Sequence, residues 1–227
     1  MIFKYDPGTM RARFKKQGYV LLKDILDDRF LAHLSEFYDR SQSDDDGELQ
    51  GWKIYGKKRQ FLFSFSSQED ANEFRDGMAR LTGIDRDSFT ISERHLKVYD
   101  AAAEPWPAPH KDRASSEISI GLPIRLPAGS SACVLPKLGI TANTDDRAIF
   151  LTDRDHPTPG KVYEMEEAIK LNEQIGDVVV FLGSALFHER INGGGTAILY
   201  LKVNGSGQDP LGENIFDDIS MPQGITT

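Results

Sequence analysis

Two histidines and one aspartate have the residue types and spacing that could do chemistry. His110 and Asp112 flank a single residue, so on an extended strand both side chains leave from the same face. His188 follows a strongly apolar run that begins at Val178. Two imidazoles and one carboxylate form the facial ligand set of non-haem Fe(II), which leaves further positions on the metal open. The three residues therefore predict a catalytic metal centre.

The chain has 5 histidines, and we expect the other three to be structural. His33 lies one residue beyond the apolar stripe of an expected helix, and His95 lies in an expected strand. His156 follows two aspartates in a polar stretch that is typical of a solvated surface loop. The metal prediction therefore rests on His110 and His188 alone.

Length and composition favour one globular domain. The 227 residues are 39% hydrophobic and include 13 Phe and 7 Tyr, enough for a sizeable core. Basic residues number 27 against 35 acidic ones, a net charge of −8. This balance disfavours a nucleic-acid partner, because phosphate binding needs clustered cations. The basic clusters over 11–16 and 53–59 are expected to be solvated faces.

Cysteine usage and apolar runs bear on the compartment. Cys133 is the only cysteine, so no internal disulfide can form, as is typical of a reducing compartment. The N-terminus lacks the apolar core of a signal peptide, and no apolar run approaches the roughly 18 residues that span a bilayer. We expect a soluble cytoplasmic protein without a membrane partner. Its oligomeric state is left open.

Residues 1–88 predict helices and strands that support a core. Apolar periodicity predicts amphipathic helices over 27–38 and 68–81. The other expected elements are a strand over 18–24, a loop over 41–47, and strands near 55 and over 61–65 that flank a turn over 56–59.

Residues 89–204 are typical of an all-β sandwich or barrel, because Pro, Gly, Asn and Asp separate most of the short apolar runs. Residues 205–227 are rich in Gly, Asp and Pro, and we expect a tail that packs over the surface or is partly disordered. The expected strands cover 89–99, 117–126, 134, 148–152, 161–165, 178–188 and 196–204, with a brief helical turn over 166–172.

Three segments resemble the Fe(II)/2-oxoglutarate-dependent dioxygenases, especially the phytanoyl-CoA and prolyl hydroxylase-like branches. They are Phe14–Leu26, Leu96–Tyr99 leading into Pro109–Asp112, and Gly176–Phe181 leading to His188. The resemblance implies a mainly β fold with flanking helices and a double-stranded β-helix core, which is a cupin-like jelly roll. It also implies one dioxygenase domain over 1–227. The metal would be Fe(II), with 2-oxoglutarate as cosubstrate and O2 as oxidant.

A buried carboxylate of 2-oxoglutarate needs a cation, because an unpaired buried charge is unfavourable. In the family this cation is an Arg, or in some branches a Lys, on the strand after the distal histidine. No Arg occupies that strand here, and Lys202 is the first candidate. Arg190 is the second candidate and Arg125 the third. Tyr99 and Thr196 are further expected contacts of 2-oxoglutarate.

The resemblance implies hydroxylation of a C–H bond with release of succinate and CO2, and the intact Asp112 favours this outcome. Desaturation or ring formation stays open. The short chain favours a small-molecule substrate, such as an amino acid or a natural-product intermediate, over a peptidyl one. Two other classes also stay open: a cupin-type metalloenzyme that does not use 2-oxoglutarate, and a non-catalytic jelly-roll binding module. The residues that either cover the barrel mouth or pack in the core are Trp52, Tyr55, Arg59, Phe61, Phe63 and Trp106.

Overall fold

A computed structural model describes residues 1–43, 52–54, 58–101, 109–151 and 168–216. The helices are η1 (Pro7–Met10), α1 (Arg11–Gln17), α2 (Asp28–Ser43), α3 (Gln68–Thr82), η2 (Arg86–Ser88) and η3 (Pro136–Leu138). The strands are β1 (Tyr19–Leu22), β2 (Trp52–Ile54), β3 (Lys58–Leu62), β4 (Thr90–Tyr99), β5 (His110–Lys111), β6 (Ile118–Arg125), β7 (Ser131–Val134), β8 (Ile149–Phe150), β9 (Ile169–Lys170), β10 (Val178–Phe181), β11 (His188–Ile191) and β12 (Ala197–Asn204).

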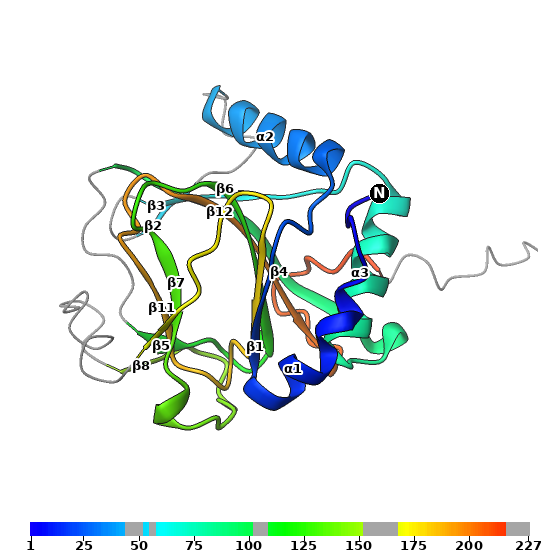
Figure 1. Cartoon of the computed structure of the whole chain (residues 1–227). Helices are drawn as coiled ribbons and strands as arrows, with labels where there is room; N and C mark the ends of the chain where they lie inside the picture. Colours follow the sequence, from blue (N-terminus) through cyan, green and yellow to red (C-terminus); the bar gives the residue numbers. More distant parts are fainter. Residues whose placement is uncertain (44–51, 55–57, 102–108, 152–167, 217–227) are drawn as a thin grey trace, which may run out of the picture.

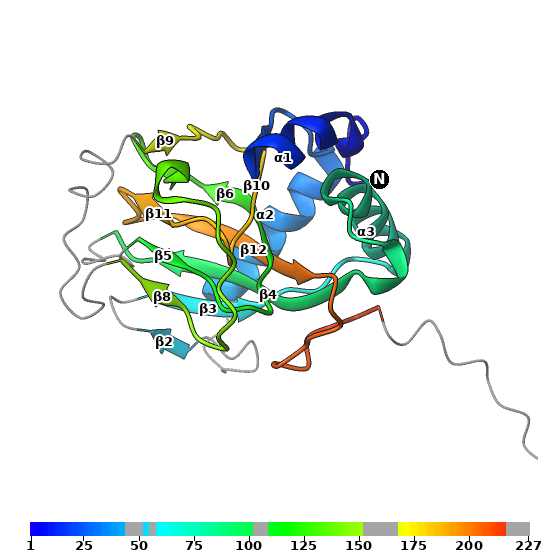
Figure 2. The same ribbon diagram turned by 90° about the horizontal axis from the view of Figure 1, so that it is seen from below.

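Within these residues the strands form two antiparallel sheets that face each other (Figures 1 and 2). The larger sheet has the order β1-β10-β6-β12-β4-β3-β2, and the smaller has the order β8-β5-β11-β7-β9. From β4 to β12 the chain passes repeatedly between them, with β4, β6, β10 and β12 in one and β5, β7, β9 and β11 in the other. This is the topology of a jelly roll. The expectation of a mainly β fold with flanking helices is confirmed.

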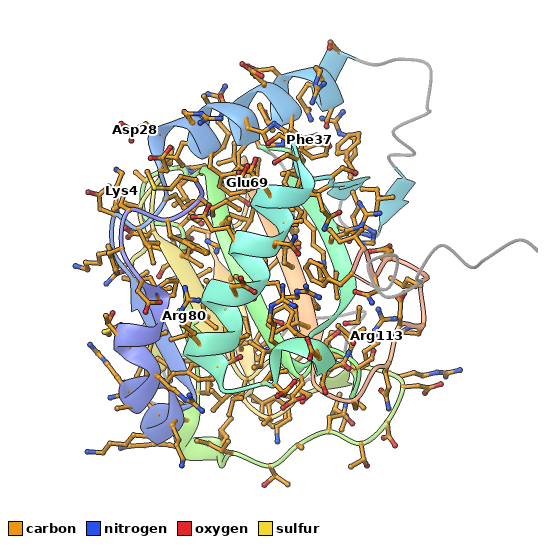
Figure 3. All side chains as sticks on the ribbon, turned by 90° about the vertical axis from the view of Figure 1, so that its right-hand side faces the viewer. Lys4, Asp28, Phe37, Glu69, Arg80 and Arg113 are labelled. Atoms are coloured by element: carbon orange, nitrogen blue, oxygen red, sulfur yellow. The ribbon has the colours of Figure 1, made fainter. Side chains whose placement is uncertain are left out.

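Helices α2 and α3 cover the face of the larger sheet that points away from the smaller sheet (Figures 1 and 3). Phenylalanines fill this layer: Phe63, fully buried, has its ring 5.4 Å from that of Phe37 and 5.1 Å from that of Phe65. Burying one such side chain stabilises the fold by roughly 1.5–3 kcal/mol. Of the two alternatives left open for Phe61 and Phe63, core packing is the one observed, because both rings lie in this core.

Helix α3 begins and ends at recognisable signals. The Ser67 hydroxyl accepts the backbone N–H of Asp70 at 3.1 Å, which caps the first turn. Glu69 and Asp70 suit the positive end of the helix dipole. Gly83 ends the helix at φ +82°, a left-handed conformation that glycine adopts without strain. The helix therefore matches the predicted range of 68–81 closely.

Some predicted boundaries in the N-terminal half are wrong. Helix α2 runs through the start of the expected loop over 41–47, since buried Ser41 donates its hydroxyl to the Phe37 carbonyl at 2.8 Å and leaves the helical turn intact. Strand β3 begins at Lys58, inside the expected turn over 56–59. Helix α1 was not predicted.

The expected single strand over 178–188 is two strands that belong to different sheets. Strand β10 ends at Phe181, and residues 182–187 turn across to β11, whose first residue is His188. The turn is closed by the N–H of Leu186, which donates to the Leu182 carbonyl at 2.9 Å. Most of its residues are buried, and Gly183-Ser184 is the only local turn signal in an otherwise apolar run.

The connection before β10 differs from its predicted structure, whereas the described C-terminal residues agree with theirs. The described part of the expected helical turn over 166–172 contains the strand β9 instead. The predicted strand over 161–165, Tyr55, Trp106 and His156 lie outside the described residues. Residues 205–216, which we call the C-terminal strap, pack over the surface as expected: Phe216 contacts Phe89, and the Asn214 side chain accepts the N–H of Ile91 at 3.1 Å.

Among the residues that the structure describes, no helix has both the length and the apolar character needed to cross a membrane.

Candidate metal centre

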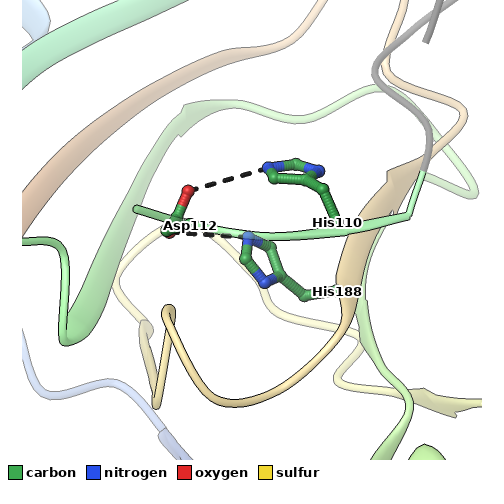
Figure 4. A group of neighbouring side chains, drawn as sticks. All are labelled: His110, Asp112 and His188. Carbon is green, nitrogen blue, oxygen red and sulfur yellow. Dashed lines mark ion pairs between the residues drawn. The ribbon is translucent and has the colours of Figure 1, made fainter. Parts of the chain in front are cut away.

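The three predicted ligands come together at one end of the space between the sheets (Figure 4). His110 on β5 and His188 on β11 stand directly opposite each other in an antiparallel pair, and their ring centroids are 4.5 Å apart. Asp112 follows β5. Its Oδ1 lies 3.7 Å from Nε2 of His110, and its Oδ2 lies 3.6 Å from Nε2 of His188. Strand pairing therefore brings distant parts of the chain to one point.

A glycine lets the turn after β10 pass close to Asp112. The Asp112 N–H donates to the Gly183 carbonyl at 2.9 Å, which fixes the backbone that carries the carboxylate. A Cβ atom at Gly183 would lie 2.7 Å from Asp112 Oδ2 and 2.4 Å from Ser119 Oγ. Both distances are too short for real contacts, so residue 183 must be glycine for this approach.

The protonation of His188 suits metal binding. Its Nδ1 donates to the Leu186 carbonyl at 3.0 Å, which leaves the lone pair on Nε2 facing Asp112. Burial lowers the pKa of His188 despite the nearby Asp112 carboxylate. The imidazole is therefore neutral near pH 7, as a metal ligand must be.

Asp112 is buried and ionised. Burial alone would raise the pKa of Asp112, but nearby groups, of which the Lys202 ammonium has the largest effect, hold it well below its ordinary value. Lys202 Nζ donates to Oδ1 at 2.5 Å, and Ser119 Oγ donates to Oδ2 at 2.6 Å. Hydrogen bonds of this kind orient ligating carboxylates in metal sites.

The donor set fits a divalent transition metal. One ligand atom from each of His110, Asp112 and His188 lies within 4.8 Å of the others. Two imidazole nitrogens with one carboxylate oxygen suit Fe(II), whereas all-oxygen sets suit Mg²⁺ or Ca²⁺. The geometry could therefore hold one ion and leave several of its positions open.

The triad opens into a cavity between the sheets. Its walls combine aromatic rings with three buried cations, so it suits an anionic ligand with an apolar part. The lining residues are Lys97, Tyr99, His110, Asp112, Ser119, Ala132, Cys133, Phe181, His188, Glu189, Arg190, Tyr200 and Lys202.

Arg190 is the cavity cation with the richest set of partners. It lies two residues after His188 on β11, so it points to the same face of the strand. Its guanidinium group donates to Glu173 at 2.5 Å, to the Ser130 hydroxyl at 3.2 Å and to the Tyr200 hydroxyl at 3.4 Å. Burial opposes its charge, but Tyr200 and Glu173 more than compensate and raise the pKa of Arg190.

The remaining predicted contacts divide into two groups. Tyr99 and Lys202 line the cavity, although the first partner of Lys202 is the Asp112 carboxylate. Arg125 lies outside the cavity lining, since its side chain is 56% exposed and contacts Asp39 and Tyr38 on α2. Thr196 also lies outside it, and its hydroxyl donates to the Gly193 carbonyl at 2.7 Å in a turn.

Lys97 and Glu173 also belong to the site, although the sequence pattern did not predict them. Lys97 lies two residues before Tyr99 on β4, so strand alternation could have found it. The ammonium group of Lys97 lies 2.7 Å from Glu93. Burial lowers the pKa of Lys97, but Glu93 outweighs burial and the net effect is a raised pKa. No local signal marks Glu173, which lies in the connection before β10 and meets Arg190 only in the folded chain.

The fold is that of solved oxygenases. EvdO2 from Micromonospora carbonacea var. aurantiaca, complexed with 2-oxoglutarate, has a TM-score of 0.55 at 14% identity over 89% of this chain and 91% of its own. A 2OG-Fe(II) oxygenase family oxidoreductase from Burkholderia pseudomallei has a TM-score of 0.53 at 11% identity over 92% and 95%. The epimerase SnoN, in complex with Fe3+, alpha ketoglutarate and nogalamycin RO, has a TM-score of 0.52 at 15% identity over 86% and 83%.

No protein-family model matches the sequence, and no curated protein matches it. At such identities the structural likeness establishes the jelly-roll fold, and the chemistry has to be argued from this chain's own residues.

Proposed function

We propose that the protein is an Fe(II)/2-oxoglutarate-dependent oxygenase that hydroxylates a C–H bond of a small molecule. The observation that carries the proposal is the His110, Asp112 and His188 triad beside the buried Arg190 in one cavity. With 2-oxoglutarate and O2, Fe(II) would supply the oxidant, and succinate and CO2 would be released. The domain proposed for this activity is the single unit over 1–227.

The charges inside the cavity favour a dianionic cosubstrate. Each of the three cations in the cavity lining pairs with a carboxylate, so these pairs are balanced before a metal is added, and burial raises the pKa of the further lining carboxylate, Glu189, to about 7. A divalent metal adds two positive charges, and a buried excess of charge is unfavourable. 2-Oxoglutarate, with its two carboxylates, restores the balance. The pairs are Lys97 with Glu93, Lys202 with Asp112 and Arg190 with Glu173.

Arg190 is the best-placed anchor for the distal carboxylate of 2-oxoglutarate. Two residues along a strand are about 7 Å apart, which suits a ligand that chelates the metal beside His188 and extends a short carbon chain. The Ser130 and Tyr200 hydroxyls can turn to donate to the same carboxylate. Lys202 is less suited, because its ammonium group is bound at 2.5 Å to the metal ligand Asp112, whereas the five-donor guanidinium of Arg190 keeps donors for a ligand beside its bond to Glu173.

In the reaction the protein itself holds and orients the metal ligands and excludes water from the cavity. Leu186 fixes the ring of His188, while Ser119 and Lys202 fix the carboxylate of Asp112. Phe150 stacks on His110 with ring centroids 5.3 Å apart, which restricts the orientation of that imidazole. Fixed ligands with a dry, shaped cavity place one substrate C–H bond at the metal.

Substrate and setting complete the proposal. The small-molecule substrate is supported by the cavity beside the triad and, by analogy, by SnoN with nogalamycin RO. A cytoplasmic setting is supported by the single cysteine, Cys133, which is buried. Because the Asp112 carboxylate would occupy a position on the metal, hydroxylation is favoured over reactions such as halogenation, in which another anion binds there instead.

An anaerobic absorption spectrum tests the proposal. Wild-type protein with Fe(II) and 2-oxoglutarate should show the weak visible charge-transfer band of bidentate chelation, and His188→Ala should not. Under air, the wild type should release succinate with a suitable substrate. Absence of the band together with no thermal stabilisation by metal would favour a non-catalytic binding module, whereas stabilisation by metal alone would favour a cupin enzyme that does not use 2-oxoglutarate.

A further inference from the structure

We propose that Lys202 is a positioning residue that keeps Asp112 a one-oxygen metal ligand, and that the C-terminal strap holds Lys202 in place through His95 and Glu93. The inference rests on the proposed function, because it requires a metal at the triad.

The two oxygens of Asp112 have different surroundings. Oδ1 accepts from the Lys202 ammonium group at 2.5 Å, and Oδ2 accepts from the neutral Ser119 hydroxyl at 2.6 Å. A charged donor binds a carboxylate oxygen more strongly than a neutral one. The ammonium charge also repels a second cation from Oδ1. A metal is therefore favoured at Oδ2, the oxygen nearer to His188.

One-oxygen binding matters for the number of open metal positions. With two histidines and one carboxylate oxygen, an octahedral ion keeps three positions open. A chelating cosubstrate takes two of them and O2 takes the third. If both oxygens of Asp112 bound the metal, one of these positions would be lost. Lys202 therefore protects cosubstrate binding without touching the cosubstrate.

Lys202 is itself held by a buried chain of charges that leads to the C-terminal strap. Its Nζ lies 4.0 Å from Glu93 Oε2, and Glu93 Oε1 lies 2.7 Å from Lys97 Nζ and 3.6 Å from His95 Nδ1. On its other side, His95 Nε2 lies 2.8 Å from Glu213 Oε1 in the strap. Arg113 reaches Glu93 from the edge of this network at 3.8 Å. The strap thus supplies the outermost charge of a network that ends at a metal ligand.

The proposal predicts opposite changes in two affinities. Lys202→Met removes a cation that competes with the metal for Asp112 and frees Oδ1, so metal should bind about tenfold more tightly. Because Asp112 can then use both oxygens, 2-oxoglutarate should bind the metal-loaded variant about tenfold more weakly. A merely structural defect would weaken both affinities. Lys202→Arg keeps the charged donor and should restore both values towards wild type.

Glu213→Gln extends the test to the strap. It weakens the hold on His95 from a distance, so both affinities should change in the same directions by a smaller factor, about threefold. Combined with Lys202→Met, it should add nothing, since both changes act through Lys202. Arg86→Met, which removes a surface ion pair with Asp76, is the matched control and should change neither affinity.

Co(II) is the probe, because the intensity of its visible bands reports the number of ligands. Each variant is titrated with Co(II) alone and then, loaded, with 2-oxoglutarate, while circular dichroism checks the fold. If wild type binds Co(II) no better than His188→Ala, the proposed function fails. If wild type binds Co(II) but Lys202→Met and Glu213→Gln leave both affinities unchanged or weaken both, the inference about Lys202 is wrong and the proposed function stands.

Discussion

The two sheets of the jelly roll differ in the length of their strands and in the candidate functional residues on them. The larger sheet contains β4 with 10 residues and β6 and β12 with 8 each, and its outer face is sealed by α2 and α3. The smaller sheet is built from strands of 2 to 4 residues. Yet His110, His188 and Arg190 all lie on the smaller sheet.

This contrast separates stability from chemistry. Most of the buried apolar side chains lie between the larger sheet and its helices, where they supply most of the hydrophobic stabilisation. The larger sheet meets the site mainly through polar side chains that point inward, such as Lys97, Ser119 and Lys202, together with the Phe181 ring beside His188. Changes in the two layers should therefore have different readouts.

The largest effect is expected in the core of the larger sheet. Phe63→Ala should destabilise the protein by about 3–5 kcal/mol, because it leaves a cavity among Phe30, Phe37 and Phe65. Metal affinity of the folded protein should not change. Urea unfolding followed by Co(II) titration measures both quantities. A large loss of metal affinity in the folded variant would show that the two layers are not separable.

The second-largest effect is expected at Arg190 in the cavity. Arg190→Met should weaken 2-oxoglutarate binding about 100-fold, because the distal carboxylate loses its charged partner. Metal binding without 2-oxoglutarate should change little. The variant leaves Glu173 buried without its cation, so Arg190→Met/Glu173→Gln is the control that relieves this charge. Equal 2-oxoglutarate affinity in wild type and in both variants would remove Arg190 as the anchor.

The strap should give a smaller, pH-dependent effect. Burial opposes the charged form of His95, but Glu213 and Glu93 outweigh it and raise its pKa above the ordinary 6.5. The ion pairs of His95 therefore stabilise the fold fully below pH 6.5, and this stability is lost as pH rises through the raised pKa. Urea unfolding over a pH series should show wild type losing stability relative to His95→Gln above pH 6.5. Parallel curves would contradict this.

The smallest effect is expected at Arg125, which lies outside the cavity lining. Arg125 is largely exposed beside Asp39, and such surface pairs contribute about 0–1 kcal/mol. Arg125→Ala should leave 2-oxoglutarate affinity unchanged by isothermal titration. A weaker affinity would mean that the cosubstrate binds elsewhere in the molecule.

The sequence predicts the parts of the site that depend on local spacing. His110 and Asp112 share a strand face by alternation, and the same rule places Lys97 beside Tyr99 and puts Lys202 on an inward face. Regular long strands such as β12 are recognisable from their pattern.

The rest depends on contacts between distant segments. Glu173 and Arg190 pair through the fold, and so do Lys202 and Asp112. The break after Phe181 is hard to recognise because only Gly183-Ser184 interrupts a largely buried, apolar run. The position of Arg125 could not be predicted from strand alternation, because the residue lies at the end of β6 and its side chain contacts Tyr38 on α2.

The pairing of His110 with His188 also bears on how the chain folds. Strand β5 pairs with β11 and β8, and β7 pairs with β11 and β9, so every partner in the smaller sheet is distant in sequence. Such contacts form slowly, because long loops must close before any pairing is gained. The ligands are scattered in the unfolded chain, so a metal binds it weakly and its binding energy is added to the folding equilibrium. Metal availability during refolding should thus decide how much of the chain reaches its native state.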